Sequence, residues 1–359
     1  MSKQHKDISS LRAVSIRFLQ AGTYLTEDIH CYDSHRLLAK SGLFLDSESL
    51  YRLRSLNRGK EIIYVTYNTY EKLMDGQIDI RRQALEEKTG YTAIKQEAVE
   101  LLNEIAENKA VECEALQIVS DELSNRLETS NASTIISLIN ALAPVDEYLQ
   151  RHCVNVGLLN GLVSKWLGMD KEAVDRLVLI GLLHDCGKAL MPPSVLNAPR
   201  KLSGVEYQII KNHSVRSYEL LADFPDIVRK AARSHHEKVD GTGYPDRLQS
   251  GDIPIEARIT AISDVYDAMV SQRAYKQPRS PFAVMAFLTG LAGTELDADL
   301  VDLFVSHMPL TLIGKQVLLS DGTIGVVRSF DIQDIEYPTV ELCGRRVKTS
   351  ADLFCVSMY

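Results

Sequence analysis

The feature that most constrains this chain is a pair of adjacent histidines followed by a glycine-rich turn, spanning His235–Pro245. The segment runs His-His-Glu-Lys-Val-Asp-Gly-Thr-Gly-Tyr-Pro. Adjacent side chains on a helix point about 100° apart, so the two imidazoles cannot both face one apolar core. They suit the end of a helix, where both rings can reach a polar target such as a metal ion. The glycines supply the positive φ angles of a sharp loop, and the proline fixes its exit.

Length and charge narrow the class of protein. A chain of 359 residues exceeds the usual single-domain size, which predicts two or three domains. The net charge of -8 argues against binding of a nucleic-acid polymer, because that requires basic surface to displace counterions. A small phosphorylated ligand is compatible with an acidic protein, since a metal site supplies local positive charge.

Cysteine spacing and hydropathy predict a cytoplasmic protein. The six cysteines include no CxxC pair, a pattern typical of reduced thiols rather than of a disulfide framework. The first residues contain no apolar stretch, and the apolar run at 177–183 is far shorter than a membrane span. We therefore expect neither export nor membrane insertion.

Hydrophobic periodicity divides the chain into four predicted segments. They are an α+β module over 1–90, a connector helix over 91–132, an all-α domain over 133–310 and a small β module over 311–359. The first combines a β-like run at 62–67 with helical spacing at 47–57, and it could have a regulatory or sensory role. The connector helix either docks onto the all-α domain or pairs with a second subunit, so a homodimer is the alternative.

Glycine and proline breaks predict the individual helices of the all-α domain. Their spans are 133–142, 147–167, 171–187, 204–221, 225–237, 254–270, 281–290 and 297–307. After the last helix, an Asp321-Gly322 turn between two apolar runs predicts a β-hairpin.

Histidines and carboxylates gather in the all-α domain. Six of the nine histidines fall there, and five of them are candidate ligands, namely His152, His184, His213, His235 and His236. A single helical histidine is more often structural than a metal ligand. Asp185, however, follows His184 directly, and Asp264 interrupts an apolar helical segment, where an unpaired charge is costly. The joint pattern predicts a metal site.

The residue types also indicate the chemistry of that site. Imidazole and carboxylate ligands suit iron, manganese or zinc, and the lack of paired cysteines argues against a structural zinc site. Asp185 is the natural bridge between two divalent cations. Such a pair would acidify a shared water, and the resulting hydroxide could attack phosphorus. This is the chemistry of metal-dependent phosphoester hydrolysis.

In chain order, these residues resemble the signature of the HD-GYP domain. The matching positions are His152, His184-Asp185-Cys186-Gly187-Lys188, His213, His235-His236-Glu237, Asp240-Gly241-Thr242-Gly243-Tyr244-Pro245, Asp264, Asp267, Arg273 and Lys276. HD-GYP proteins are a subgroup of the HD-superfamily metal-dependent phosphohydrolases, associated with hydrolysis of the bacterial second messenger cyclic di-GMP. The resemblance covers about 135–310 and implies an HD-type helical bundle there.

The resemblance implies two metal sites that share one carboxylate. The first would use His152, His184, Asp185 and Asp264, and the second Asp185, His213, His235 and His236. Lys188 would act with Asp185 as a catalytic residue and reach the phosphodiester. Arg273 and Lys276 would contact the other phosphate, so that cations surround the charge that develops on the phosphoryl oxygens.

The resemblance also assigns roles to the turn after the histidine pair. The GYP loop comprises Asp240, Gly241, Gly243, Tyr244 and Pro245. We expect it to close the mouth of the site, and contact with GGDEF-domain proteins is a further role that the resemblance implies.

One position departs from the pattern of some relatives. Members with three metals carry a glutamate four residues before the first histidine, on the same helix face. This chain has Tyr148 there, and Glu147 is rotated away by about 100°. We therefore predict two divalent metal ions, either iron or manganese.

The predicted function is that of a cytoplasmic, metal-dependent phosphodiesterase. It would hydrolyse cyclic di-GMP to pGpG, with GMP as a further product left open, by attack of a metal-activated hydroxide at a binuclear site. One alternative is a non-catalytic cyclic-dinucleotide receptor or interaction protein that keeps the fold. The other is an HD hydrolase of a different cyclic dinucleotide.

Overall fold

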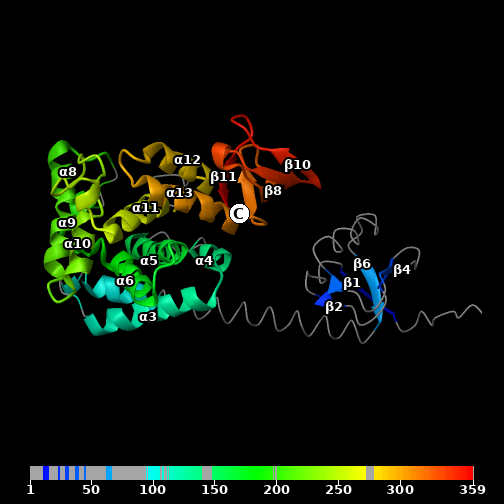
Figure 1. Cartoon of the computed structure of the whole chain (residues 1–359), viewed down its shortest axis with the longest axis horizontal. Helices are drawn as coiled ribbons and strands as arrows, with labels where there is room; N and C mark the ends of the chain where they lie inside the picture. Colours follow the sequence, from blue (N-terminus) through cyan, green and yellow to red (C-terminus); the bar gives the residue numbers. More distant parts are fainter. Residues whose placement is uncertain are drawn as a thin grey trace, which may run out of the picture. The chain divides into compact units, whose positions relative to one another are not determined.

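The computed structural model of the chain divides into two compact units, Met1–Gly90 and Tyr91–Tyr359, which are described separately (Figure 1). In the first unit the structure describes residues 11–15, 23–24, 29–31, 37–39, 44–45 and 62–66. In the second it describes most of 94–139, then 148–271 apart from 197 and 199, and finally 279–358.

The first unit contains antiparallel strands. The larger sheet has the order β1-β6-β3-β4, formed by β1 (Leu11–Ser15), β6 (Ile62–Thr66), β3 (Ile29–Cys31) and β4 (Leu37–Ala39). A second pair joins β2 (Thr23–Tyr24) to β5 (Phe44–Leu45). The predicted strand at 62–67 is therefore present as β6, whereas the predicted helix at 47–57 lies outside the described residues.

The second unit is mostly helical. Its longer helices are α3 (Cys113–Thr129), α4 (Ala132–Ile139), α5 (Tyr148–Trp166), α6 (Lys171–Leu183), α8 (Gly204–Lys211), α9 (His213–Leu220), α10 (Asp226–Ser234), α11 (Ile255–Val270), α12 (Pro281–Leu291) and α13 (Ala298–His307). Short helical turns are η4 (Cys186–Leu190), α7 (Pro193–Leu196), η5 (Ser250–Asp252), η6 (Met308–Leu312) and η7 (Ile332–Asp334). The prediction of an all-α domain is confirmed for the described residues between 133 and 310.

Two glycines let α5 and α6 approach closely at the centre of the bundle. A Cβ atom on Gly181 of α6 would lie only 2.4 Å from the Cα atom of Gly157 in α5. Any larger side chain at Gly181 would force the helices apart, because interiors are close-packed. This contact fixes α5 beside the end of α6, which is where His184 follows.

Two predicted helices are interrupted, and a third, predicted at 225–237, ends at Ser234. The predicted helix at 171–187 stops at Leu183 and is followed by a turn and by η4. The predicted helix at 204–221 is divided at Asn212 into α8 and α9, with no glycine or proline at the break. Both breaks place a histidine at a helix terminus, and neither is visible in the hydrophobic spacing.

A small antiparallel sheet forms the C-terminal part of the second unit. Its strand order is β10-β9-β8-β7-β11, formed by β7 (Gln316–Leu319), β8 (Ile324–Ser329), β9 (Thr339–Leu342), β10 (Arg345–Lys348) and β11 (Cys355–Met358). The predicted hairpin around Asp321-Gly322 is confirmed as β7 and β8. Buried side chains of this sheet, such as Val317 and Val340, belong to the same apolar core as the helices. Among the described helices, none combines the length and hydropathy needed to cross a membrane.

Candidate metal centre

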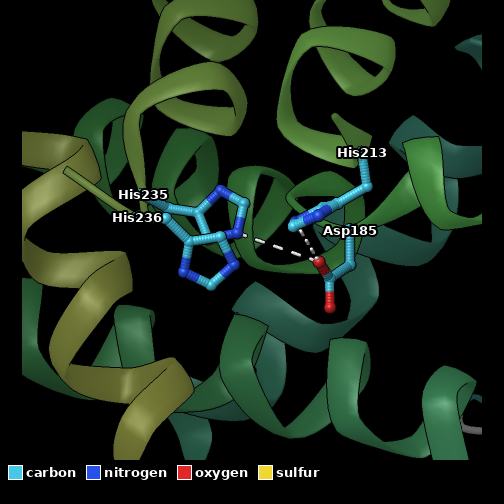
Figure 2. Close-up of side chains that lie close together, drawn as sticks. All are labelled: Asp185, His213, His235 and His236. Carbon is cyan, nitrogen blue, oxygen red and sulfur yellow. Dashed lines mark ion pairs between the residues drawn. The ribbon is translucent and has the colours of Figure 1, made fainter. Parts of the chain in front are cut away.

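Helix ends bring the predicted histidines together. His184 follows the last residue of α6, His213 begins α9, and His235 follows the last residue of α10. All three are almost completely buried. Figure 2 shows His213, His235 and His236 converging with Asp185 from separate segments of the bundle. The prediction that the histidine pair lies where a helix ends agrees with α10 ending at Ser234.

Backbone carbonyl groups fix the orientation of these three rings. The Nδ1 atom of His184 donates to the carbonyl of Gly181 at 2.8 Å. His213 and His235 make the same contact with carbonyls three residues before them, at 2.6 Å and 2.8 Å. A carbonyl can only accept, so Nδ1 carries the proton and Nε2 presents a lone pair. These three Nε2 atoms are buried and have no hydrogen-bond partner among the described residues.

Asp185 lies at the centre of the cluster, between two groups of histidines. Its Oδ1 atom is 3.2 Å from Nε2 of His213 and 3.8 Å from Nε2 of His235. Its Oδ2 atom is 3.3 Å from Nε2 of His184 and 3.9 Å from Nε2 of His152. One oxygen of a single buried carboxylate thus faces each group of histidines, which is the arrangement that a bridging ligand requires.

The potential ligand atoms form two groups. Asp185, His213, His235 and His236 can each offer an atom within 4.8 Å of the others, and so can His152, His184 and Asp185. Asp264 stands between the groups, with Oδ1 3.0 Å from Nε2 of His152 and Oδ2 3.9 Å from Nδ1 of His236. Buried polar atoms without partners are costly unless a cation satisfies them. The donor set therefore fits divalent metal ions.

The charge state of the cluster also favours cation binding. Burial disfavours the charge of Asp185, but Lys188 and His184 hold the pKa of its carboxyl well below the usual range. Lys188 forms an ion pair with Asp185. Burial, reinforced by the neighbouring imidazoles, lowers the pKa of His235 well below its ordinary value, and burial chiefly lowers that of His236 to about 3. Ionised carboxylate and neutral imidazole are the forms that bind metals.

His152 has a different support from the other histidines. Its Nδ1 atom lies 2.7 Å from a carboxylate oxygen of Asp267, which is fully buried. Asp267 also accepts hydrogen bonds from Asn155 at 2.8 Å and from Ser271 at 3.0 Å. Burial opposes protonation of His152, yet the carboxylates of Asp264 and Asp267 outweigh it and raise the pKa of His152 to about 9. Asp267 belongs to the sequence motif, but its role becomes apparent only from this contact.

The sequence of this chain matches that of a known protein family. A family model described as an HD domain matches residues 118–300. The chain belongs to the HD-domain family. The resemblance to HD-GYP proteins predicted from the sequence is confirmed.

Several bacterial phosphodiesterases are similar to this HD-domain protein. The 3'3'-cGAMP-specific phosphodiesterase 2 of Vibrio cholerae is 31% identical over 225 residues, which cover 60% of this chain and 42% of that protein. The cyclic di-GMP phosphodiesterase response regulator RpfG of Xanthomonas campestris is 36% identical over 182 residues, or 50% and 48% of the two chains. The chain thus spans about half the length of these two relatives. The cyclic di-GMP phosphodiesterase PA4108 of Pseudomonas aeruginosa is 27% identical over 339 residues, covering 88% and 81%.

A solved structure supports the fold of the HD-domain protein. Bd1817, described as an HDG"Y"P protein from Bdellovibrio bacteriovorus, superposes with a TM-score of 0.53 at 18% identity, covering 83% of this chain and 99% of that one. At this identity the likeness shows the fold alone.

The GYP loop of this HD-domain protein is held by its own backbone contacts. Gly241 has a φ of 79°, and a Cβ atom on Gly243 would lie 2.4 Å from the amide nitrogen of Lys238. The buried Glu237 carboxylate accepts from the amides of Asp246 at 2.6 Å and Leu248 at 3.1 Å. Both glycines are therefore required by the loop geometry. Glu237, the residue after the histidine pair, fastens the segment that follows the loop.

The remaining predicted site residues belong to the GYP loop or lie outside the described residues. Asp240 caps its own turn by accepting from the amide of Thr242 at 2.9 Å. The ring of Tyr244 lies 4.8 Å from that of His236. Arg273 and Lys276 lie outside the described residues, so the structure does not place them against the cluster.

Proposed function

We propose that this HD-domain protein is a metal-dependent phosphodiesterase that hydrolyses cyclic di-GMP to pGpG. The observation that carries the proposal is the buried Asp185 carboxylate, which directs one oxygen to each of two histidine groups. The similarity to cyclic di-GMP phosphodiesterases supports the choice of substrate class. A second hydrolysis of pGpG would give GMP.

We assign one proposed cation to His152, His184, Asp185 and Asp264, and a second to Asp185, His213, His235 and His236. The unpartnered Nε2 atoms of three of these histidines support the assignment. Iron or manganese suits such a set of imidazoles and carboxylates. When bound, two such cations lower the pKa of water and stabilise negative charge on the phosphoryl oxygens. Because Tyr148 replaces a glutamate at the position discussed above, we propose two ions rather than three.

Residues of the chain itself would hold the substrate. Lys188 is kept charged, because the Asp185 and Asp264 carboxylates raise its pKa against the opposing effect of burial. Its side chain is partly exposed, and its ammonium group could donate to a phosphodiester oxygen beside Asp185. Arg273 and Lys276 are the proposed contacts of the second phosphate. We propose that the GYP loop, which packs Tyr244 on His236, closes the mouth of the site.

We also propose a role for each segment of the chain. The HD-type domain at 133–310 would be catalytic, the module at 1–90 regulatory, 91–132 a connector and 311–359 a small β module. The reduced cysteines favour a cytoplasmic protein. We further propose that the GYP loop contacts GGDEF-domain proteins. The connector would form a homodimer by pairing with the connector of a second subunit.

A second candidate substrate is 3'3'-cGAMP. Relatives named as 3'3'-cGAMP-specific phosphodiesterases are 31% and 34% identical to this chain over the matched residues. The catalytic residues proposed above would serve either substrate, because both contain the same two phosphodiester groups. A receptor that binds cyclic dinucleotides without turnover is the non-enzymatic alternative.

One experiment separates these possibilities. The protein is purified without chelators, its metal content is measured, and it is incubated with cyclic di-GMP or 3'3'-cGAMP in Mn²⁺ or Fe²⁺ buffer. Chromatography should show pGpG accumulating from cyclic di-GMP. Intact cyclic di-GMP after prolonged incubation with a fully metallated protein would contradict the proposal, and tight binding under those conditions would support the receptor.

A further inference from the structure

Helix α8 offers a polar and aromatic face beside the candidate metal centre. It lies at the outer edge of the second unit next to α9 (Figure 1), and none of its residues is buried. Tyr207 is 49% exposed. Lys211 follows one turn later on the same side of the helix, with its Nζ atom 4.9 Å from the centre of the Tyr207 ring.

The same lysine links this face to the GYP loop. Its Nζ atom lies 5.0 Å from the centre of the Tyr244 ring. The Tyr244 ring in turn lies 4.8 Å from the His236 ring, at an interplanar angle of 31°. His236 has the most exposed side chain of the clustered histidines, at 25% against 3% or less for the others. The Lys211 ammonium group therefore lies between the Tyr207 ring and the Tyr244 ring, and the Tyr244 ring contacts the most exposed histidine of the cluster.

Lys211 is available to bind a ligand. In the part of the chain that the structure describes, no ion pair joins Lys211 to a carboxylate. Arg200, by contrast, pairs with Glu206 of α8. An aromatic face holds an ammonium group in place without neutralising it. Lys211 thus presents a positioned, unneutralised donor next to an exposed aromatic ring.

We infer that Tyr207, Lys211 and Tyr244 bind one guanine base of a cyclic dinucleotide while a phosphate of the same molecule occupies the metal centre. The inference rests on the function proposed above and identifies the base that the site recognises. An exposed aromatic ring stacks with any base. Lysine donates to the O6 and N7 acceptors of guanine, whereas the same edge of adenine carries N7 and an amino donor. Stacking would give affinity, and Lys211 would give preference for guanine.

Substitutions on one helix separate the two contributions. We compare Tyr207→Ala, Lys211→Met and the control Val205→Ala, since Val205 is 74% exposed on another side of α8. For each protein loaded with Mn²⁺, kcat, KM and dissociation constants are measured with cyclic di-GMP and with cyclic di-AMP. Circular dichroism confirms that each variant is folded.

The two variants should differ in a defined way. Tyr207→Ala should weaken binding of both dinucleotides about tenfold, because stacking does not depend on the base. Lys211→Met should weaken binding of cyclic di-GMP about tenfold and leave cyclic di-AMP nearly unchanged, which removes the guanine preference. Lys211→Arg should restore that preference, and Val205→Ala should match the parent.

Other outcomes overturn specific parts of the account. If the parent hydrolyses cyclic di-GMP but all variants keep its affinity and preference, the inference fails and the proposed function stands. An equal loss of both dinucleotides in Lys211→Met would show that the lysine binds phosphate rather than guanine. If the parent neither binds nor cleaves cyclic di-GMP, the proposed function and the inference fail together.

Discussion

Two histidines on opposite sides of Asp185 are held in different ways. His213 donates through Nδ1 to the backbone carbonyl of Ile210, and it faces Oδ1 of Asp185. His152 instead places Nδ1 against the buried carboxylate of Asp267 and lies on the Oδ2 side. A carbonyl carries no net charge, whereas a carboxylate makes its histidine partner more basic. His152 thus differs from His184, His213 and His235, whose Nδ1 atoms donate to backbone carbonyls.

The difference has consequences for metal binding. On the His213 side, His235 and His236 have lowered pKa values, so their lone pairs are free at neutral pH. On the other side, the pKa of His152 is raised to about 9, so without metal its ring is protonated at neutral pH. Metal binding must therefore displace a proton from His152. We expect the two proposed sites to fill with different pH dependence.

The largest expected effect comes from removing the residue that the two sides share. Asp185→Ala should lower kcat for cyclic di-GMP by at least about a thousandfold, because neither proposed cation keeps its bridging ligand. Asp226→Ala is the matched control, since its side chain is 57% exposed on α10. Turnover by Asp185→Ala at the rate of the parent would show that the two sides do not depend on a common carboxylate.

A second prediction concerns stability without metal. The folded pKa of His152, about 9, lies above the ordinary histidine value of 6.5, so its protonation stabilises the folded state. That contribution is fully present below pH 6.5 and is lost as the pH rises through 9. Urea unfolding of the chelator-treated protein should show a loss of about 2–3 kcal/mol between these limits. His152→Gln should flatten the profile, and an unchanged slope in this variant would assign the effect to another group.

The third prediction tests the carboxylate support directly. Asp267→Asn keeps the shape of the side chain but removes the charge behind His152. We expect Mn²⁺ affinity to fall about 10- to 100-fold at one site and to be retained at the other. Calorimetric titration with Mn²⁺ resolves the two, with the exposed Asp299→Asn as control. Equal weakening of both sites would contradict the distinction between the two sides.

The smallest expected effect concerns the loop beside His236. Glu237 accepts from two backbone amides, and Gln offers only one acceptor oxygen in its place. Glu237→Gln should therefore lower the free energy of unfolding by about 1–2 kcal/mol. Glu172→Gln, with a side chain that is 91% exposed, provides the control in the same chemical denaturation assay. No difference between the two variants would show that Glu237 does not fasten the loop.

Much of the helical unit was predictable, because its signals are local. Amphipathic spacing and helix breakers located α5, α11 and α12 to within a few residues. The motif also named the histidines and carboxylates that the fold brings together. The break at Asn212 left no such signal, since no glycine or proline marks it and tertiary packing turns His213 inward.

The contact between His152 and Asp267 also could not be predicted from the sequence, because it depends on tertiary packing. Asp267 lies on α11, 115 residues after His152, so their contact depends on how α11 packs against α5. Sequence spacing reports which side chains share a helix face, but it does not report which face of another helix they meet. The difference between the two sides of the cluster therefore emerges only from the tertiary structure.

The most direct test of the central claim is the number of cations that the cluster binds. Protein treated with chelator is reloaded with excess Mn²⁺, freed of unbound metal by gel filtration and measured by inductively coupled plasma mass spectrometry. The two groups around Asp185 predict two manganese ions per chain in the parent. One ion per chain, or none, would contradict a binuclear centre built on a shared Asp185.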